Sequence, residues 1–208
     1  MRAVANVDLE RLLSLARAGD RPALGQLLEL YRAYLGLLAR VQIGRRLQGK
    51  VNASDLVQET FLKAHEHFAD FRGESERELA AWLRRILSRR LTNLVHRHYG
   101  TQRRNVALER QLVAELDKSS HVLDQGLVAR QNSPSHQAAR REQAVQLANA
   151  LDRLPAAYRE VLILRHLEGL TFPEVAQRLN RSVGSVEKLW VRGLTRLREF
   201  LEIAHESR

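Results

Sequence analysis

The sequence predicts an all-α protein: two small helical domains joined by a linker, the C-terminal one with a helix-turn-helix. Leu and Ala supply 60 of the 208 residues and Ile only four. Apolar residues recur at spacings of three and four, the period of an amphipathic helix, and no strand pattern competes. Between Gly100 and about Ser135 this periodicity weakens and the turn-forming runs DQG and NSPS occur, which indicates the linker.

The elements follow from that periodicity. The first domain is expected to contain helices at residues 8–18, 21–46, 53–70 and 75–99, and the second at 137–153, 156–168, 171–179 and 182–203. A short helix around 106–116 is compatible with the linker. The predicted domains are therefore residues 1–100 and 136–208, with the linker at 101–135.

Composition excludes several classes of protein. The chain has no Cys, so disulfides, thiolate nucleophiles and Cys-type zinc sites are absent. No apolar run reaches the roughly 18 to 20 residues of a membrane span, and the N-terminus lacks the apolar region of a signal peptide. We therefore expect a cytoplasmic protein that does not bind membranes.

Catalytic patterns are missing as well. The sequence contains no phosphate-binding glycine loop, nucleophile elbow or metalloprotease helix motif. The pairs His65/His67 and His96/His98 have a spacing of two residues, which points the rings about 200° apart on a helix, too far apart to hold one metal. No enzymatic activity, no metal and no cofactor are expected.

The positive charge is concentrated in one segment. The chain has a formal net charge of +10, which suggests a polyanionic partner. Residues 84–104 contain seven Arg and no Asp or Glu, so this segment alone supplies +7. Just before it, residues 55–78 carry seven acids and three bases, a net charge of −4. Adjacent acidic and basic segments suggest two different partners.

The helix that begins after Asn52 is amphipathic. Its apolar side chains share one arc of the helical wheel, and its acids share the opposite arc. The acids are Asp55, Glu59, Glu66 and Asp70. Two interpretations remain open: a solvated face, or a docking face for a basic partner.

A capping box of Ser75 and Glu78 predicts the start of the next helix. Its polar side gathers Arg85, Arg89, Asn93 and His96. Arginines without a neutralising acid repel one another unless an anion meets them, which favours nucleic-acid contact over a solvated face. Trp82 borders the apolar and polar faces, where it can belong to the core or stack on an unpaired base.

The spacing from Thr171 to Leu197 is that of a helix-turn-helix. Thr171 and Glu174 predict a capping box, Ala176 permits close helix crossing, and Asn180 suits a left-handed turn. Ser182 is expected to cap the second helix. The outward face of that helix suits the major groove, although an ordinary helical hairpin remains an alternative.

Three segments resemble the extracytoplasmic-function group of bacterial RNA polymerase sigma factors. They are DLVQETFLKAHEHF (55–68), FRGESERELAAWLRRIL (71–87) and LPAAYREVLILRHLEGLTFPEVAQRLNRSVGSVEKLWVRGLTRLREFL (154–201). The resemblance implies a region 2 domain that binds polymerase and the minus-10 promoter element, and a region 4 domain that binds the minus-35 element. Implied partners are the polymerase core, at its β′ clamp helices and β flap, promoter DNA, and an anti-sigma factor.

The residue patterns and the resemblance together predict three sets of binding residues. Core polymerase is assigned Asp55, Leu56, Gln58 and Glu59. The minus-10 element is assigned Arg72, Glu74, Ser75, Trp82, Arg85, Arg89, Asn93 and Arg97. The minus-35 element is assigned Arg181, Ser182, Ser185, Lys188, Arg192 and Arg196.

The sequence departs from the family pattern at a few of these surfaces. Arg89 and Asn93 stand where many members carry Asn and Asp, and Glu187 and Leu189 replace a frequent Lys and Arg. Two rival functions are disfavoured. An ordinary helix-turn-helix regulator would need neither the acidic helix nor the arginine-rich segment, and a nucleic-acid enzyme would need a metal or nucleophile constellation.

Overall fold

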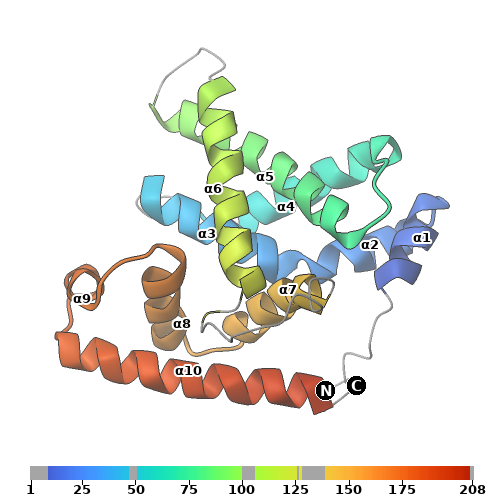
Figure 1. Cartoon of the computed structure of the whole chain (residues 1–208). Helices are drawn as coiled ribbons and strands as arrows, with labels where there is room; N and C mark the ends of the chain where they lie inside the picture. The colour runs from blue at the N-terminus through green and yellow to red at the C-terminus, as the bar shows by residue number, and fades with distance from the viewer. Residues whose placement is uncertain (1–8, 47–50, 100–105, 126, 128–138, 207–208) are drawn as a thin grey trace. The chain divides into compact units, whose positions relative to one another are not determined.

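The computed structural model describes residues 9–46, 51–99, 106–125, 127 and 139–206 of the chain (Figure 1). It divides into an N-terminal unit that ends at Ser120 and a C-terminal unit that begins at His121. Over the described ranges every regular element is helical, which confirms the predicted fold class.

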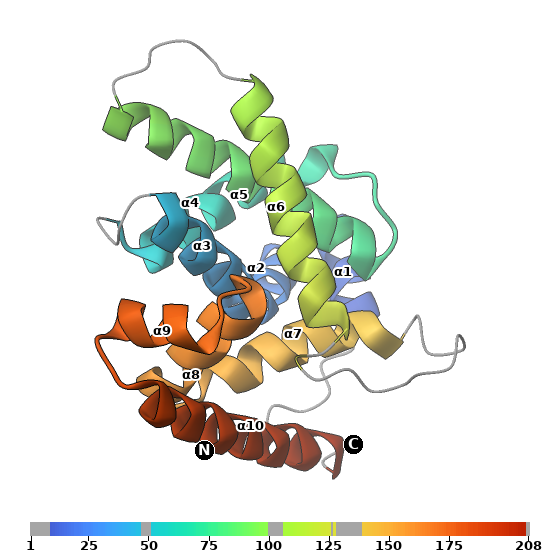
Figure 2. The same cartoon turned by 60° about the vertical axis from the view of Figure 1, so that its left-hand side comes forward.

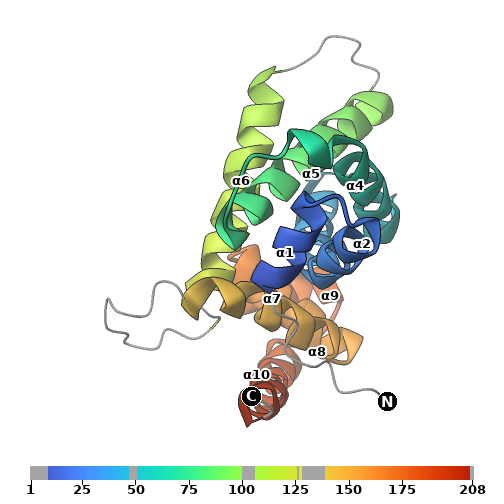
Figure 3. The ribbon, with the colours of Figure 1, turned by 90° about the vertical axis from the view of Figure 1, so that its right-hand side faces the viewer.

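The N-terminal unit is built from successive helices. They are α1 (Leu9–Arg17), α2 (Arg21–Leu30), α3 (Arg32–Arg46), α4 (Ala53–His67), the 3-10 turn η1 (Phe68–Asp70) and α5 (Glu76–Tyr99). Helix α1 packs on α2 (Figure 3), and α3 packs on both α4 and α5. Fully buried leucines such as Leu35, Leu83 and Leu87 fill the space between them.

The single helix expected over residues 21–46 is in fact two helices. Tyr31 separates α2 from α3 with φ −90° and ψ 0°, and its N–H donates to the Leu28 carbonyl at 3.0 Å. The next turn resumes at once, because the Leu35 N–H donates to the Tyr31 carbonyl at 2.9 Å. Apolar periodicity continues across this junction, so the sequence pattern did not reveal it.

Helix α6 (Val106–Gln125) occupies much of the predicted linker. It is longer than the short helix expected at 106–116, and the part up to Ser120 belongs to the N-terminal unit. Leu112 and Leu116 are completely buried. Part of the predicted linker is therefore a packed element of the first unit.

The C-terminal unit contains the helix-turn-helix (Figure 2). Its elements are α7 (Ala139–Asp152), α8 (Ala156–Leu162), the π-helical turn η3 (Ile163–Leu167), α9 (Phe172–Leu179) and α10 (Val183–Glu206). A buried cluster of Val161, Leu164, Val175, Ala176 and Val186 joins η3 and helices α8, α9 and α10. This cluster packs α10 against the helices that precede it.

Candidate nucleic-acid interface

The polar face of α5 forms a cationic stripe on the N-terminal unit. Arg85, Arg89, Asn93 and Arg97 are all exposed, and their spacing of four residues keeps them close to one face of the helix. Arg85 forms no ion pair with any residue that the structure describes. Of the four side chains that the sequence placed on this face, Arg85, Arg89 and Asn93 are exposed, whereas His96 is half-buried.

The expectation that the arginine-rich segment lacks acidic partners is wrong. Arg84 Nε pairs with Asp117 of α6 at 2.6 Å, and Arg89 Nε pairs with Glu109 of α6 at 3.1 Å. These acids follow the basic segment by 33 and 20 residues, so counting charges within the segment could not find them. Helix α6 therefore neutralises part of the stripe.

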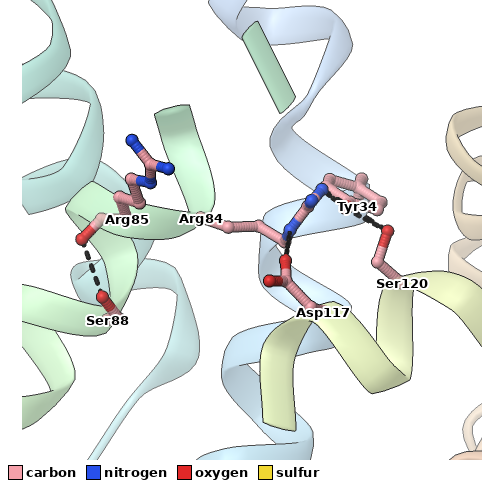
Figure 4. Close-up of polar contacts among 6 residues, drawn as sticks. All are labelled: Tyr34, Arg84, Arg85, Ser88, Asp117 and Ser120. Atoms are coloured by element: carbon pink, nitrogen blue, oxygen red, sulfur yellow. Dashed lines mark hydrogen bonds and ion pairs between the residues drawn. The ribbon is translucent and has the colours of Figure 1, made fainter. Parts of the chain in front are cut away.

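The side chains of Arg84 and Arg85 point in different directions from α5 (Figure 4). The Arg84 side chain is 13% exposed and also donates from Nη1 to the Tyr34 hydroxyl at 2.8 Å. That hydroxyl in turn donates to Ser120 Oγ at 2.8 Å. Burial opposes the charged form of Arg84, but Tyr34 and Asp117 outweigh it and raise the pKa of the guanidinium. Arg84 therefore links α3, α5 and α6.

The loop before α5 is organised by Glu78. Its carboxylate accepts the backbone N–H of Glu74 at 2.9 Å and that of Ser75 at 3.1 Å, together with the Ser75 hydroxyl at 2.8 Å. These donors, the Glu74 N–H first, lower the pKa of Glu78. The Glu78 N–H donates back to Ser75 Oγ at 3.4 Å, so the predicted capping box is confirmed.

Gly73, in the middle of this loop, lies against the ring of Phe71. Arg72 is exposed and donates to the Ala69 carbonyl at 3.0 Å, and Glu74 is exposed as well. A Cβ added at Gly73 would overlap Phe71 Cζ and would lie 2.7 Å from both Phe71 Cε2 and Glu78 Cβ. Only a residue without a side chain fits against that ring, a close approach that the sequence analysis did not anticipate.

Trp82 belongs to an aromatic cluster. Its ring centroid lies 5.1 Å from that of Phe71 and 6.0 Å from that of Phe68, and the side chain is half-buried. Such tilted contacts are typical of aromatic packing. Of the two open interpretations for Trp82, membership of the core fits these contacts better than base stacking.

Helix α4 presents the predicted acidic face. Asp55 and Gln58 are exposed and Glu59 is half-buried, and Asn52 caps the helix by accepting the Ser54 N–H at 3.0 Å. Leu56, which the sequence grouped with them, is only 3% exposed and packs inside the unit. Leu62 is instead 64% exposed on the polar side. It is the apolar residue that the sequence analysis missed.

Helices α9 and α10 form the predicted turn. The Thr171 N–H and hydroxyl both donate to the Glu174 carboxylate at 2.7 Å, which lowers the pKa of Glu174. Asn180 has φ 50° and ψ 51°, the left-handed conformation expected of it. The Ser185 N–H donates to Ser182 Oγ at 3.3 Å, so Ser182 caps α10.

The exposed face of α10 carries most of the predicted DNA contacts. Arg181, Ser182, Lys188 and Arg192 are exposed, and Ser185 is half-buried. Arg196 is exposed too, but its Nη1 pairs with Glu199 at 2.7 Å and its guanidinium lies 5.1 Å from the centroid of the Phe200 ring. Arg196 is therefore engaged by side chains of its own helix.

His166 contacts α10 through Trp190. The Trp190 indole N–H donates to His166 Nε2 at 2.9 Å, and the two rings are nearly parallel, with an interplanar angle of 17°. Burial, and secondarily the charge of Arg165, lowers the pKa of His166. Only a neutral ring can accept this hydrogen bond, so geometry and electrostatics agree on the protonation state.

Two other kinds of feature are absent from the described residues. No cluster of three or more His, Cys, Asp or Glu side chains there could hold a metal ion. No described helix is long and apolar enough to cross a membrane.

Comparisons with known proteins match both units. The family model for sigma-70 region 2 matches residues 30–103, and that for sigma-70 region 4 matches residues 144–197. The extracytoplasmic-function (ECF) RNA polymerase sigma factor BldN of Streptomyces coelicolor is 30% identical over 203 residues, which cover 96% of this chain and 69% of that protein. The RNA polymerase sigma factor CnrH of Cupriavidus metallidurans is 29% identical over 202 residues, 96% and 98% of the respective chains.

A solved structure of an RsbN–BldN complex also matches. It aligns with 90% of this chain and 97% of that chain at 26% identity, with a TM-score of 0.32.

Proposed function

The chain belongs to the ECF sigma factors of bacterial RNA polymerase, which direct promoter-specific transcription initiation, and on that premise we propose how its surfaces divide this task. Residues 1–100 bind core polymerase and the minus-10 element, and residues 136–208 bind the minus-35 element. The segment 101–135 connects them. The observation that carries the proposal is the pairing of an acidic face on α4 with a cationic stripe on α5.

We assign the acidic face of α4 to the polymerase. Asp55, Gln58 and Glu59 offer two carboxylates and an amide to a basic partner surface, and the exposed Leu62 adds apolar area beside them. Charged residues steer association while an apolar residue near the centre contributes affinity. Leu56 is left out of this contact because it is buried. The counterpart on polymerase is the β′ clamp helices, as the family resemblance implies.

The cationic stripe of α5 is assigned to the opened minus-10 element. Arg85, Arg89 and Arg97 can neutralise phosphates, and Asn93 supplies an amide that can read a base edge. The neighbouring loop at residues 72–75 adds Arg72 beside a backbone held rigid by Glu78. A rigid loop next to a cationic stripe suits a displaced single strand, whose bases are read outside the stack.

The exposed face at the start of α10 is assigned to duplex DNA at the minus-35 element. Ser185 and Lys188 are near enough to the N-terminus of the helix to reach base edges, and Arg181 and Arg192 are placed to hold phosphates. Neither unit needs to bind tightly alone, because tethering raises the effective concentration of the second contact. The protein contributes recognition and recruitment, and the polymerase contributes the chemistry.

Transcription with purified core polymerase tests the function as a whole. Core enzyme plus this protein, given a library of genomic promoter fragments, is expected to start transcripts that core enzyme alone does not. An absence of new transcripts would contradict the proposal. An ordinary helix-turn-helix regulator would bind duplex fragments in the same mixture without creating new start sites.

Charge reversal tests the polymerase surface. The double variant Asp55→Lys and Glu59→Lys is expected to weaken binding to core enzyme and to leave duplex DNA binding intact. Its matched control reverses two exposed acids of the C-terminal unit, Glu160→Lys and Glu202→Lys, with the same change in net charge. Equal loss of core binding in both variants would mean that total charge, not the α4 face, governs the contact.

A further inference from the structure

The acidic side of α6 lies against basic side chains of the N-terminal unit. Glu109 pairs with Arg89, Glu115 with Arg46 at 2.8 Å, and Asp117 with Arg84. Of the acids that α6 carries up to Ser120, all three are used in this way. A helix that places its carboxylates on arginines occupies positions where phosphates would otherwise bind.

The two ends of this contact differ in burial. At the C-terminal end, Asp117 and Ser120 are tied to Arg84 and Tyr34, and the Arg84 side chain is 13% exposed. At the N-terminal end, the Arg89 side chain is 64% exposed, and among the described residues its one hydrogen-bond partner is Glu109, to which Nε donates. The two ends are eight residues apart, or about 12 Å along the helix. The two ion pairs therefore differ chiefly at the arginine, because Asp117 is 51% exposed and Glu109 is 24% exposed.

We propose that Glu109 is an internal competitor of DNA, and that the first turns of α6 cover part of the minus-10 surface until promoter DNA displaces them. This inference rests on the proposed function of Arg89. An exposed ion pair contributes only about 0.2 to 1 kcal/mol, so it can hold α6 in place yet yield to a phosphate. A phosphate approaching Arg89 meets the Glu109 carboxylate, and like charges at that distance repel.

The Arg84 anchor determines how α6 responds. The Arg84 side chain is 13% exposed and its bonds join three helices, so a phosphate reaches it less readily than the 64% exposed Arg89. Displacement is therefore confined to the turns that precede Leu112, where Val106 is 51% exposed. The turns of α6 that precede Leu112 move away from the cationic stripe, and the rest of the helix stays attached through Arg84.

Binding of the full chain to a fluorescent, random-sequence single-stranded DNA oligonucleotide tests the inference at about 0.1 M salt. The variants are Glu109→Gln, Arg89→Ala and the two combined. The matched control is Glu29→Gln, which removes the same charge from another exposed ion pair, the one with Arg32. We expect Glu109→Gln to tighten binding about two- to five-fold, the range that an exposed pair supports. Glu29→Gln should change it by less than about 1.5-fold.

The Arg89→Ala variant separates this inference from the proposed function. One outcome is that Arg89→Ala weakens oligonucleotide binding while Glu109→Gln tightens it no more than Glu29→Gln does. In that case the proposed competition by Glu109 is wrong, and the assignment of Arg89 to DNA is retained. A gain from Glu109→Gln that persists in the Arg89→Ala background also overturns the competition. If Arg89→Ala leaves binding unchanged, the assignment of Arg89 to DNA fails, and the competition fails with it.

Hydrogen exchange of the same complex gives an independent readout. Saturating oligonucleotide is expected to speed exchange of backbone amides at residues 109–112 while leaving those at 117–120 as slow as in the free protein. Unchanged or slower exchange at 109–112 on DNA binding would overturn displacement of the cover.

Discussion

Arg84 and Asp117 form an ion pair of 2.6 Å between α5 and α6 in which the arginine side chain is 13% exposed. The next residue, Arg85, is exposed and points away from this network (Figure 4). Consecutive arginines of one basic segment thus differ in environment: Arg84 is committed to the fold, and Arg85 is available to a ligand. The net charge of the segment overstates what it can offer to DNA.

The first prediction compares how much Arg84 and Arg85 each contribute to the free energy of unfolding. Arg84→Ala removes a largely buried guanidinium with bonds to Asp117 and Tyr34, so it is expected to lower the free energy of unfolding by about 2 to 3 kcal/mol. Arg85→Ala, its matched control, should change that free energy by less than about 0.5 kcal/mol. Urea denaturation followed by circular dichroism measures both. Equal losses in the two variants would contradict the distinction drawn from their burial.

A second prediction concerns Gly73. A methyl group there would overlap the Phe71 ring and lie 2.7 Å from Glu78 Cβ, so Gly73→Ala should force the loop to shift and destabilise the N-terminal unit by about 1 to 3 kcal/mol. Promoter opening by the holoenzyme should fall with it. The control is Gly36→Ala in α3, where an added Cβ has nothing within 4 Å and should instead stabilise the helix by up to about 1 kcal/mol. Thermal unfolding of both variants provides the comparison.

Sequence patterns confined to a few neighbouring residues predicted their local structure, whereas contacts between residues far apart in the sequence were missed. The capping boxes at Ser75 and Thr171 and the left-handed Asn180 each depend on a few adjacent residues, and the structure has them as expected. The α6 contacts were missed because they join residues 20 or more positions apart. No charge count within one segment contains that information.

The sequence prediction put Leu56, and not Leu62, on the exposed face of α4, and this error has a geometric cause. On a helical wheel both leucines flank the apolar arc of α4, at roughly 110° and roughly 130° from its centre on opposite sides. Periodicity alone therefore cannot say which flank is covered. Packing against neighbouring helices decides it: Leu56 is 3% exposed and Leu62 is 64% exposed.

A third prediction compares two arginines of α10. Arg192→Ala should weaken binding to duplex minus-35 DNA and lower the slope of log K against log salt by about 1, because one phosphate contact is lost. Arg196→Ala should leave that slope unchanged, since Arg196 is bonded to Glu199 and lies over Phe200. Fluorescence anisotropy over a salt series measures both slopes. A larger change from Arg196→Ala would reverse the assignment of phosphate contacts along the helix.

The last prediction is a pH dependence centred on His166. Burial and Arg165 lower its pKa in the folded protein, so the unfolded chain binds the proton more tightly. The stabilisation is therefore complete above the unfolded value of about 6.5, and it declines as the pH falls through that value toward the folded pKa. An NMR titration of His166, with urea midpoints on both sides of that pH, measures the effect. Trp190→Phe should raise the pKa of His166, because it removes an indole N–H whose hydrogen bond only the neutral imidazole can accept. A wild-type pKa above the unfolded value would mean that the His166 ring is charged and that Trp190 does not donate to it.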